Sequence, residues 1–68
     1  MSKKERIVST HVERYDGPWL TRVNVKAVDE EGNIASGTKM GGLGGMAKTT
    51  ESDVAVATSR AIRNLPDK

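Results

Sequence analysis

Residues 19–28 read Trp-Leu-Thr-Arg-Val-Asn-Val-Lys-Ala-Val, and this stretch decides the fold. Every second side chain is apolar or β-branched, whereas most of the side chains between them are polar. A period of two is typical of a strand that is buried on one face and solvated on the other. The expected core face carries Trp19, Thr21, Val23, Val25 and Ala27, and the expected wet face carries Leu20, Arg22, Asn24, Lys26 and Val28.

The segment before this strand, residues 6–15, alternates in the same way and is predicted to be a second strand. Asp16-Gly17-Pro18 follows it and favours a turn, because glycine tolerates positive φ and proline fixes its own φ. The expected core face carries Val8, Thr10 and Val12, and the expected wet face carries Ser9, His11, Glu13 and Tyr15.

A second turn follows the central strand, where residues 29–33 read Asp-Glu-Glu-Gly-Asn. This composition favours a type I turn closed by a glycine bulge, with residues 33–40 as the third strand. We expect Ile34, Ser36, Thr38 and Met40 to point inward and Ala35, Gly37 and Lys39 to point outward. The reverse register stays open, because Gly37 weakens the strand pattern.

The last part of the chain combines a glycine-rich loop, residues 41–48, with a helix predicted over residues 50–64. Thr50 is suited to cap the helix, and Glu51 and Asp53 favour its first turn. Pro66 ends it, because the residue before a proline disfavours helical geometry. Apolar positions recur at helical spacing in Val54, Ala57, Thr58, Ala61, Ile62 and Leu65.

The sequence therefore predicts an α+β fold. A three-stranded antiparallel β-meander would be followed by one C-terminal α-helix packed on one face (β-β-β-α), in a single small domain over residues 1–68. The core is thin and has no disulfide to support it, so we expect either low stability or a homo-oligomer, most simply a homodimer. The predicted core comprises Val8, Val12, Trp19, Val23, Val25, Ile34, Met40, Val54, Ala57, Ala61, Ile62 and Leu65, with Leu43 and Met46 as further candidates.

The composition of the chain argues against several classes of function. The chain has no cysteine and one histidine, His11, so no thiolate or histidine cluster can hold a metal, and we predict neither a metal nor a cofactor. No nucleophile–base–orienter set is recognisable, so no catalytic residue is predicted and we expect a protein that is not an enzyme. No apolar run approaches the ~20 residues of a membrane span. The basic residues 1–6 precede no apolar signal region, so we expect a cytoplasmic protein without a membrane partner.

The outer face of the predicted sheet is the leading candidate site, for nucleic acid. Basic, amide and aromatic groups suit phosphates, base edges and stacking. Acidic residues gather instead at the second turn and the helix start, so this face is more basic than the net charge of +2 suggests. The predicted contacts are Arg22, Asn24, Lys26, Lys39, His11 and Tyr15, with Lys3, Lys4 and Arg6 as further phosphate contacts. The alternative is an ordinary solvated sheet face in which Glu13 pairs with Arg22 or Lys26.

In predicted architecture alone, without a shared motif, the chain resembles the amino-terminal domain of some phage-type integrases and the plant AP2 domain. That resemblance implies a sheet that lies in the major groove of DNA.

The glycine-rich loop is the second candidate, for a phosphate or a nucleotide. Residues 42–49 read Gly-Leu-Gly-Gly-Met-Ala-Lys-Thr, with Ala47 where a P-loop has its last glycine. Glycine amides, a lysine and a helix N-terminus all favour an anion, but 68 residues cannot supply the parallel sheet of a nucleotide hydrolase. A flexible connection is the alternative. The anion ligands would be Gly42, Gly44, Gly45, Lys48 and Thr49.

The third candidate is a protein partner, which would make the chain an inhibitor or adaptor of the kind that bacteria and their phages encode. Docking would use an edge strand or the outer face of the helix. On that face Val56 is an apolar residue among polar ones, flanked by Arg60 and Arg63. Such a residue can anchor a partner, although single exposed apolar residues are also normal.

Overall fold

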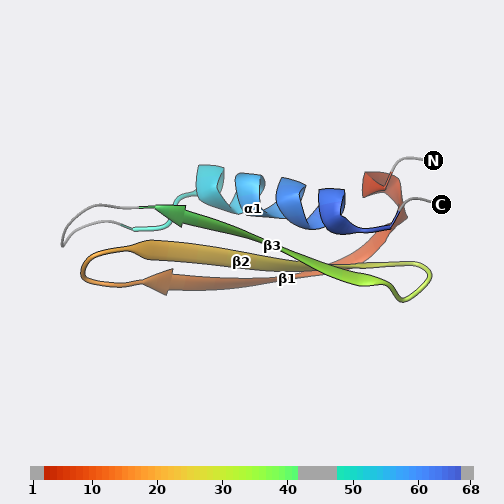
Figure 1. Ribbon diagram of the computed structural model, residues 1–68, viewed down its shortest axis with the longest axis horizontal. Coiled ribbons are helices and arrows are strands. Elements are labelled where there is room, and N and C mark those ends of the chain that lie inside the picture. Colours follow the sequence, from red (N-terminus) through yellow and green to blue (C-terminus); the bar gives the residue numbers. More distant parts are fainter. Residues whose placement is uncertain (1–2, 42–47, 67–68) are drawn as a thin grey trace.

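The computed structural model describes residues 3–41 and 48–66, which form three strands and one α-helix after a short 3-10 turn. The strands are β1 (Ile7–Asp16), β2 (Thr21–Asp29) and β3 (Ile34–Gly41), and the α-helix is α1 (Glu51–Asn64). The 3-10 turn, η1, spans Lys4–Arg6. The strands are antiparallel in the order β1-β2-β3, and α1 packs against one face of the sheet (Figure 1). This confirms the predicted β-β-β-α fold.

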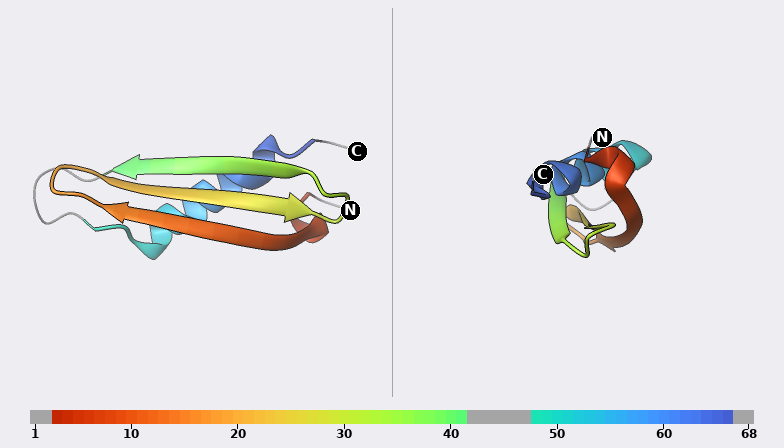
Figure 2. Two further views of the ribbon diagram at one scale, coloured as in Figure 1. Left: turned by 90° about the horizontal axis from the view of Figure 1, so that it is seen from below. Right: turned by 90° about the vertical axis from the view of Figure 1, so that its right-hand side faces the viewer.

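The molecule is long and narrow, with extents of 42 × 15 × 15 Å. The helix crosses the sheet diagonally, from the turn end of β1 to the outer side of β3, and leaves the opposite face of the sheet uncovered (Figure 2). The first and last described residues, Lys3 and Pro66, lie at the same end of the sheet (Figure 1). There Lys3 Nζ donates to the carbonyl of Arg63 at 2.9 Å, and Arg6 Nη2 donates to the carbonyl of Pro66 at 3.3 Å.

The β2–β3 turn has the predicted geometry. Gly32 N–H donates to the carbonyl of Asp29, Asp29 N–H donates to the carbonyl of Asn33, and both distances are 3.0 Å. Gly32 has a φ of 85°, the left-handed conformation that a type I turn with a glycine bulge requires. The turn therefore fixes which residues of β2 and β3 lie opposite each other.

A buried carboxylate, that of Asp29, holds the same turn together. It accepts hydrogen bonds from the main-chain N–H groups of Glu31 and Asn33, both at 2.9 Å, and from Asn33 Nδ2 at 3.0 Å. Burial alone would raise the pKa of Asp29, but these hydrogen bonds and the nearby Arg6 charge outweigh it and lower the pKa. Asp29 therefore stays ionised inside the protein.

The core is built from small side chains between β2 and α1. It comprises Val23, Val25, Ala27, Ala57, Ala61 and Leu65. The predicted phase of the central strand is confirmed, since its three core residues are fully buried. Gly37 of β3 lies against the helix so closely that an added Cβ would collide with the main chain of Ala57 and Ala61.

Strand β3 faces the opposite way from the preferred prediction and adopts the reverse register. Ala35, Gly37 and Lys39 lie opposite Ala27, Val25 and Val23 and therefore share the helix-covered face. Ile34 and Met40, which were predicted in the core, are 67% and 57% exposed. The physical reason is the turn, which sets the register, together with the close approach of α1, which only a small residue permits.

Strand β1 has the predicted face but not the predicted burial. Thr10 and Val12 lie opposite Ala27 and Val25, on the helix side. Since α1 covers mainly β2 and β3, Val12 remains 38% exposed. Val8 is exposed at a register shift between Ile7 and Ser9, where Ile7 packs against the core instead.

The remaining residues predicted in the core are exposed, half-buried or outside the described residues. Trp19 lies in the β1–β2 turn and is 75% exposed, because β2 begins only at Thr21. Val54 and Ile62 are half-buried rather than buried. Leu43 and Met46 lie outside the described residues.

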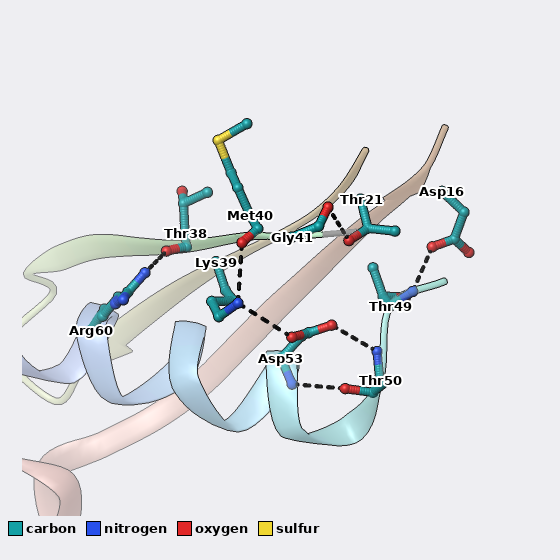
Figure 3. Close-up of polar contacts among 10 residues, drawn as sticks. All are labelled: Asp16, Thr21, Thr38, Lys39, Met40, Gly41, Thr49, Thr50, Asp53 and Arg60. Atoms are coloured by element: carbon teal, nitrogen blue, oxygen red, sulfur yellow. Dashed lines mark hydrogen bonds and ion pairs between the residues drawn. The ribbon is translucent and has the colours of Figure 1, made fainter. Parts of the chain in front are cut away.

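The helix begins as predicted. Thr50 Oγ1 accepts from Asp53 N–H at 3.2 Å, and Asp53 Oδ2 accepts from Thr50 N–H at 3.0 Å, which completes a capping box (Figure 3). At the other end Leu65 is the C-cap, directly before Pro66. These signals position α1 along the sheet.

Candidate nucleic-acid interface

The uncovered outer face of the sheet is organised in four rows across the three strands. Strand pairing places three side chains, one from each strand, in every row. In order along the sheet, the rows are Ser9–Val28–Ile34, His11–Lys26–Ser36, Glu13–Asn24–Thr38 and Tyr15–Arg22–Met40. Five of the six predicted nucleic-acid contacts therefore lie on this one face, in the last three rows.

The row at the β1–β2 end contains the site's aromatic group. The guanidinium carbon of Arg22 lies over the ring of Tyr15, 6.0 Å from its centroid. Gly17 supports the same ring from the turn, because an added Cβ there would collide with the Tyr15 side chain. Met40 completes the row and is exposed. Turn and strand pairing together therefore hold a flat cationic–aromatic surface open to solvent.

Polar groups surround this surface. Thr38 Oγ1 donates to Asn24 Oδ1 at 2.9 Å, which leaves the Asn24 amide nitrogen as a donor on the outer face. A hollow at this point is lined by Glu13, Arg14, Tyr15, Arg22, Asn24 and Thr38. One row further on, Lys26 and His11 lie opposite each other. Glu13 is the one carboxylate in the four rows.

Lys39 does not belong to this face, contrary to expectation. It lies opposite Val23 on the helix side, where its Nζ is 3.7 Å from Asp53 Oδ1 and donates to the carbonyl of Met40 at 3.1 Å (Figure 3). Arg6 is likewise buried, with its Nη1 3.6 Å from Glu31, and is not accessible to a phosphate. Both corrections reduce the positive charge available to a ligand.

The anion site proposed on the glycine-rich loop is described only at its end. Gly42, Gly44 and Gly45 lie outside the described residues, and Lys48 is exposed. Thr49 N–H donates to Asp16 Oδ1 at 2.8 Å, and Thr50 N–H is taken by Asp53 (Figure 3). Two main-chain N–H groups near the helix start therefore already donate hydrogen bonds to carboxylates of the chain itself.

The outer helix face offers less than the sequence indicated. Val56 is half-buried rather than exposed. Arg60 Nη1 donates to the carbonyl of Thr38 at 2.7 Å, so its side chain is bound to the edge of β3. Arg63 is exposed and, with Arg60 and Asn64, lines a hollow beside that edge.

Two residues of the outer surface were not predicted from the sequence. Ile34 and Met40 were assigned to the core, yet they form the ends of two outer rows. The signal that could have revealed them is Gly37, since a glycine in the middle of a strand often marks the close approach of another backbone.

Comparisons with models of known protein families, with curated proteins and with solved structures found no match. Within residues 3–41 and 48–66, no helix is long and apolar enough to cross a membrane. The same residues contain no group of three or more His, Cys, Asp or Glu side chains that could hold a metal ion.

Proposed function

We propose that this protein is a non-enzymatic module that binds single-stranded nucleic acid through the outer face of its sheet. The observation that carries the proposal is the Tyr15–Arg22 pair on a sheet face that α1 leaves open. Unpaired bases stack on aromatic rings and on guanidinium planes, and each such contact contributes about 1–3 kcal/mol. Lys26 and Arg22 would neutralise phosphates on either side of the stacked base.

A single strand fits this face better than a duplex because the excess of positive charge is small. Arg22 and Lys26 are opposed by Glu13 in the row between them. Affinity that depends on few phosphate contacts must come from stacking and from hydrogen bonds to base edges, and both need unpaired bases. The Asn24 amide beside the Tyr15–Arg22 pair would supply such a hydrogen bond.

The proposal also assigns a setting. We assign the protein to the cytoplasm, where nucleic acid is available as a ligand, and to the accessory proteins that bacteria and their phages encode. Both assignments belong to the proposal and depend on the nucleic-acid contact.

Fluorescence anisotropy with labelled single-stranded DNA and RNA tests the function. We expect binding at low ionic strength, with a slope of log K against log salt of about −1.4 if two phosphates are contacted. Tyr15→Ala should weaken binding about 10-fold or more, as the loss of one stacked base requires. Arg63→Ala is the matched control, since the exposed Arg63 lies on α1, on the other side of the sheet, and its removal should leave affinity unchanged.

Two results would contradict this function. One is an unchanged anisotropy for both nucleic acids at low salt, where phosphate contacts are strongest. The other is a loss of affinity for Arg63→Ala that equals the loss for Tyr15→Ala, because binding would then not be specific to the outer face.

A protein partner that docks by an edge strand is the second candidate function, and one observation favours it. The outer edge of β1 carries no hydrogen bond from the described residues. An open strand edge is a template for strand addition. The geometry of the β1 edge determines which kind of partner can pair with it.

A further inference from the structure

The main-chain groups at the two edges of the sheet can be identified from the turns. Gly17 N–H donates to the carbonyl of Leu20 at 2.9 Å, so these two residues form a hydrogen-bonded pair. Bonded and non-bonded pairs alternate along antiparallel strands. The main-chain groups of Tyr15 and Glu13 therefore point toward β2, whereas those of Thr10, Val12 and Arg14 point to the free edge.

The outer edge of β3 differs from that of β1. Because Asp29 and Asn33 are bonded, the main-chain groups of Ile34, Ser36, Thr38 and Met40 point to the outer edge. The carbonyls of the last three residues accept side-chain hydrogen bonds. The donors are Asn64 for Ser36 (2.9 Å), Arg60 for Thr38 (2.7 Å) and Lys39 for Met40 (3.1 Å).

The edge of β1 has no such cover. None of the described residues donates to, or accepts from, its outward main-chain groups. Val12, at the centre of this edge, is 38% exposed. Helix α1 reaches β1 only near the turn end of the strand, where Arg14 Nη2 lies 3.0 Å from Glu51 Oε1 (Figure 2). The unpaired N–H and C=O groups of such an edge are a template for pairing with another chain.

We propose that the partner is a second copy of this chain, paired antiparallel through β1 about a two-fold axis at Val12. The two sheets would then form one continuous six-stranded sheet. A two-fold axis makes identical strands antiparallel, and the outward groups of Thr10, Val12 and Arg14 would form about six main-chain hydrogen bonds.

Side chains select this register. With Val12 opposite its own copy, His11 lies opposite Glu13 of the second copy, and the same contact recurs on the other side of the axis. Valine against valine and histidine against a carboxylate are favourable cross-strand pairs. The interface is thus complementary to itself, as a two-fold dimer requires.

The neighbouring registers are unfavourable. The outward groups occur at every second residue, so the axis can move only one position at a time along β1. An axis at Glu13 places two carboxylates opposite each other, and an axis at Arg14 places two guanidinium groups opposite each other. An axis at His11 opposes two imidazoles, and an axis at Thr10 brings the irregular Val8 into the ladder.

This inference does not depend on nucleic-acid binding, so its test omits nucleic acid. Sedimentation equilibrium of the full chain from about 1 µM to about 1 mM should show a monomer–dimer equilibrium, since one strand pair is a small, weak interface. Val12→Pro should weaken association at least ~10-fold, because it removes an edge donor without breaking the β1–β2 ladder. Ser36→Pro makes the same change on the edge of β3 and should leave association unchanged.

Thermal unfolding, recorded for both proline variants, establishes that each is folded at the temperature of sedimentation. A monomer at every concentration overturns the proposal. An equal loss of association for folded Val12→Pro and folded Ser36→Pro also overturns it, because the interface would then not be specific to β1.

A charge exchange tests the register itself. His11→Glu should weaken association, because it places two carboxylates opposite each other on each side of the axis. The double variant His11→Glu/Glu13→His restores the complementary pair in exchanged positions and should recover association. A double variant as weak as the single one would show that these residues do not face each other.

Cross-linking provides a second measurement, since the chain has no cysteine of its own. In oxidised glutathione, Val12→Cys should form an intermolecular disulfide at least ~10-fold faster than Ile34→Cys. Accessibility alone predicts the reverse order, because Ile34 is 67% exposed and Val12 is 38% exposed. Faster cross-linking at Ile34 would therefore overturn the proposed axis.

Discussion

The two edge strands of this sheet are treated differently by the rest of the chain. Strand β3 is flanked by α1, and Arg60, Asn64 and Lys39 donate to its outward carbonyls. Strand β1 is the longest strand, yet its main side-chain link to the helix is the exposed ion pair between Arg14 and Glu51, at 3.0 Å. The difference shows that one helix of this length protects one edge and leaves the other available for association.

The choice between the edges depends on side-chain size. Gly37 and Ala35 on β3 let the helix main chain approach closely, whereas the corresponding positions of β1 carry Val12 and Thr10. A helix over β1 would have to sit further from the sheet and would leave a gap in the packing. The small side chains of β3 therefore favour packing of α1 over this strand, and the edge of β1 is left open as a consequence.

The largest effect is expected where the helix touches β3. Gly37→Ala should destabilise the protein by about 3 kcal/mol, because the new methyl group collides with helix main chain that cannot rotate away. Urea denaturation followed by circular dichroism measures the change in free energy of unfolding.

Gly41→Ala, in the same strand, is the control for Gly37→Ala. Its new methyl group would lie 3.4 Å from Lys39 Nζ and 3.7 Å from Thr21 Oγ1, which are ordinary contacts. We expect unchanged or slightly higher stability, since alanine restricts the unfolded chain more than glycine does. Equal losses in the two variants would break the argument that close packing selects β3.

The central strand could be predicted from sequence because its burial depends on local alternation alone. With a strand on each side and α1 over one face, every second residue of β2 is buried, as the pattern Val23, Val25 and Ala27 indicated. The helix start was equally local, since Thr50 and Asp53 cap each other. Such features need no knowledge of distant contacts.

The edge strands could not be predicted in the same way. The apolar residues Val12, Ile34 and Met40 fit a core pattern, but their burial depends on which strands the later helix, Glu51–Asn64, covers. The prediction of the candidate site was partly wrong for a related reason. Lys39 was assigned to the outer face because side-chain alternation in β3 is ambiguous around Gly37. The predicted bulged turn, which pairs Asp29 with Asn33, sets the observed register and places Lys39 opposite Val23.

The next largest effect on stability is expected from the side chains that donate to the outward carbonyls of β3. Arg60→Ala should lower the free energy of unfolding by about 1 kcal/mol, because it removes the donor to the Thr38 carbonyl and the packing of the arginine stem. Arg63→Ala is the matched control on the same helix, since the exposed Arg63 side chain makes no hydrogen bond or ion pair in the described structure.

Arg60→Ala should also raise self-association at high concentration, since a second edge becomes open. Sedimentation velocity measures this. An unaltered sedimentation profile combined with unaltered stability would show that Arg60 does not protect the edge.

A smaller loss of stability is expected at low pH, where Asp53 becomes protonated. Hydrogen bonding from Thr50 N–H lowers the pKa of Asp53 below its ordinary 3.8, and the Lys39 charge adds to this, although partial burial opposes it. The stability that this carboxylate contributes is present above pH 3.8 and is lost as the pH falls through the lower folded-state pKa. The Thr50 hydroxyl still caps the helix afterwards, so the loss is partial.

Thermal unfolding between pH 6 and pH 2 checks the acid effect, with Asp53→Asn as the control. The variant lacks the titrating group, so its unfolding temperature should fall less over the acid range. The difference between the two curves isolates Asp53 from Asp29, which also has a lowered pKa and is unchanged in both proteins. Parallel curves would contradict a role for Asp53 in acid.

The smallest effect is expected at the edge of β1. The Arg14–Glu51 pair is 3.0 Å long, but both side chains are largely in water, so its coupling energy should not exceed ~0.5 kcal/mol. A double-mutant cycle with Arg14→Ala and Glu51→Ala measures that coupling. The Lys39–Asp53 pair of β3 is longer, at 3.7 Å, yet both of its side chains are less exposed, so its cycle should give the larger coupling. Should the shorter pair couple more strongly, the helix would be held to both edges alike, and burial would not explain why one edge of this sheet is attached and the other is open.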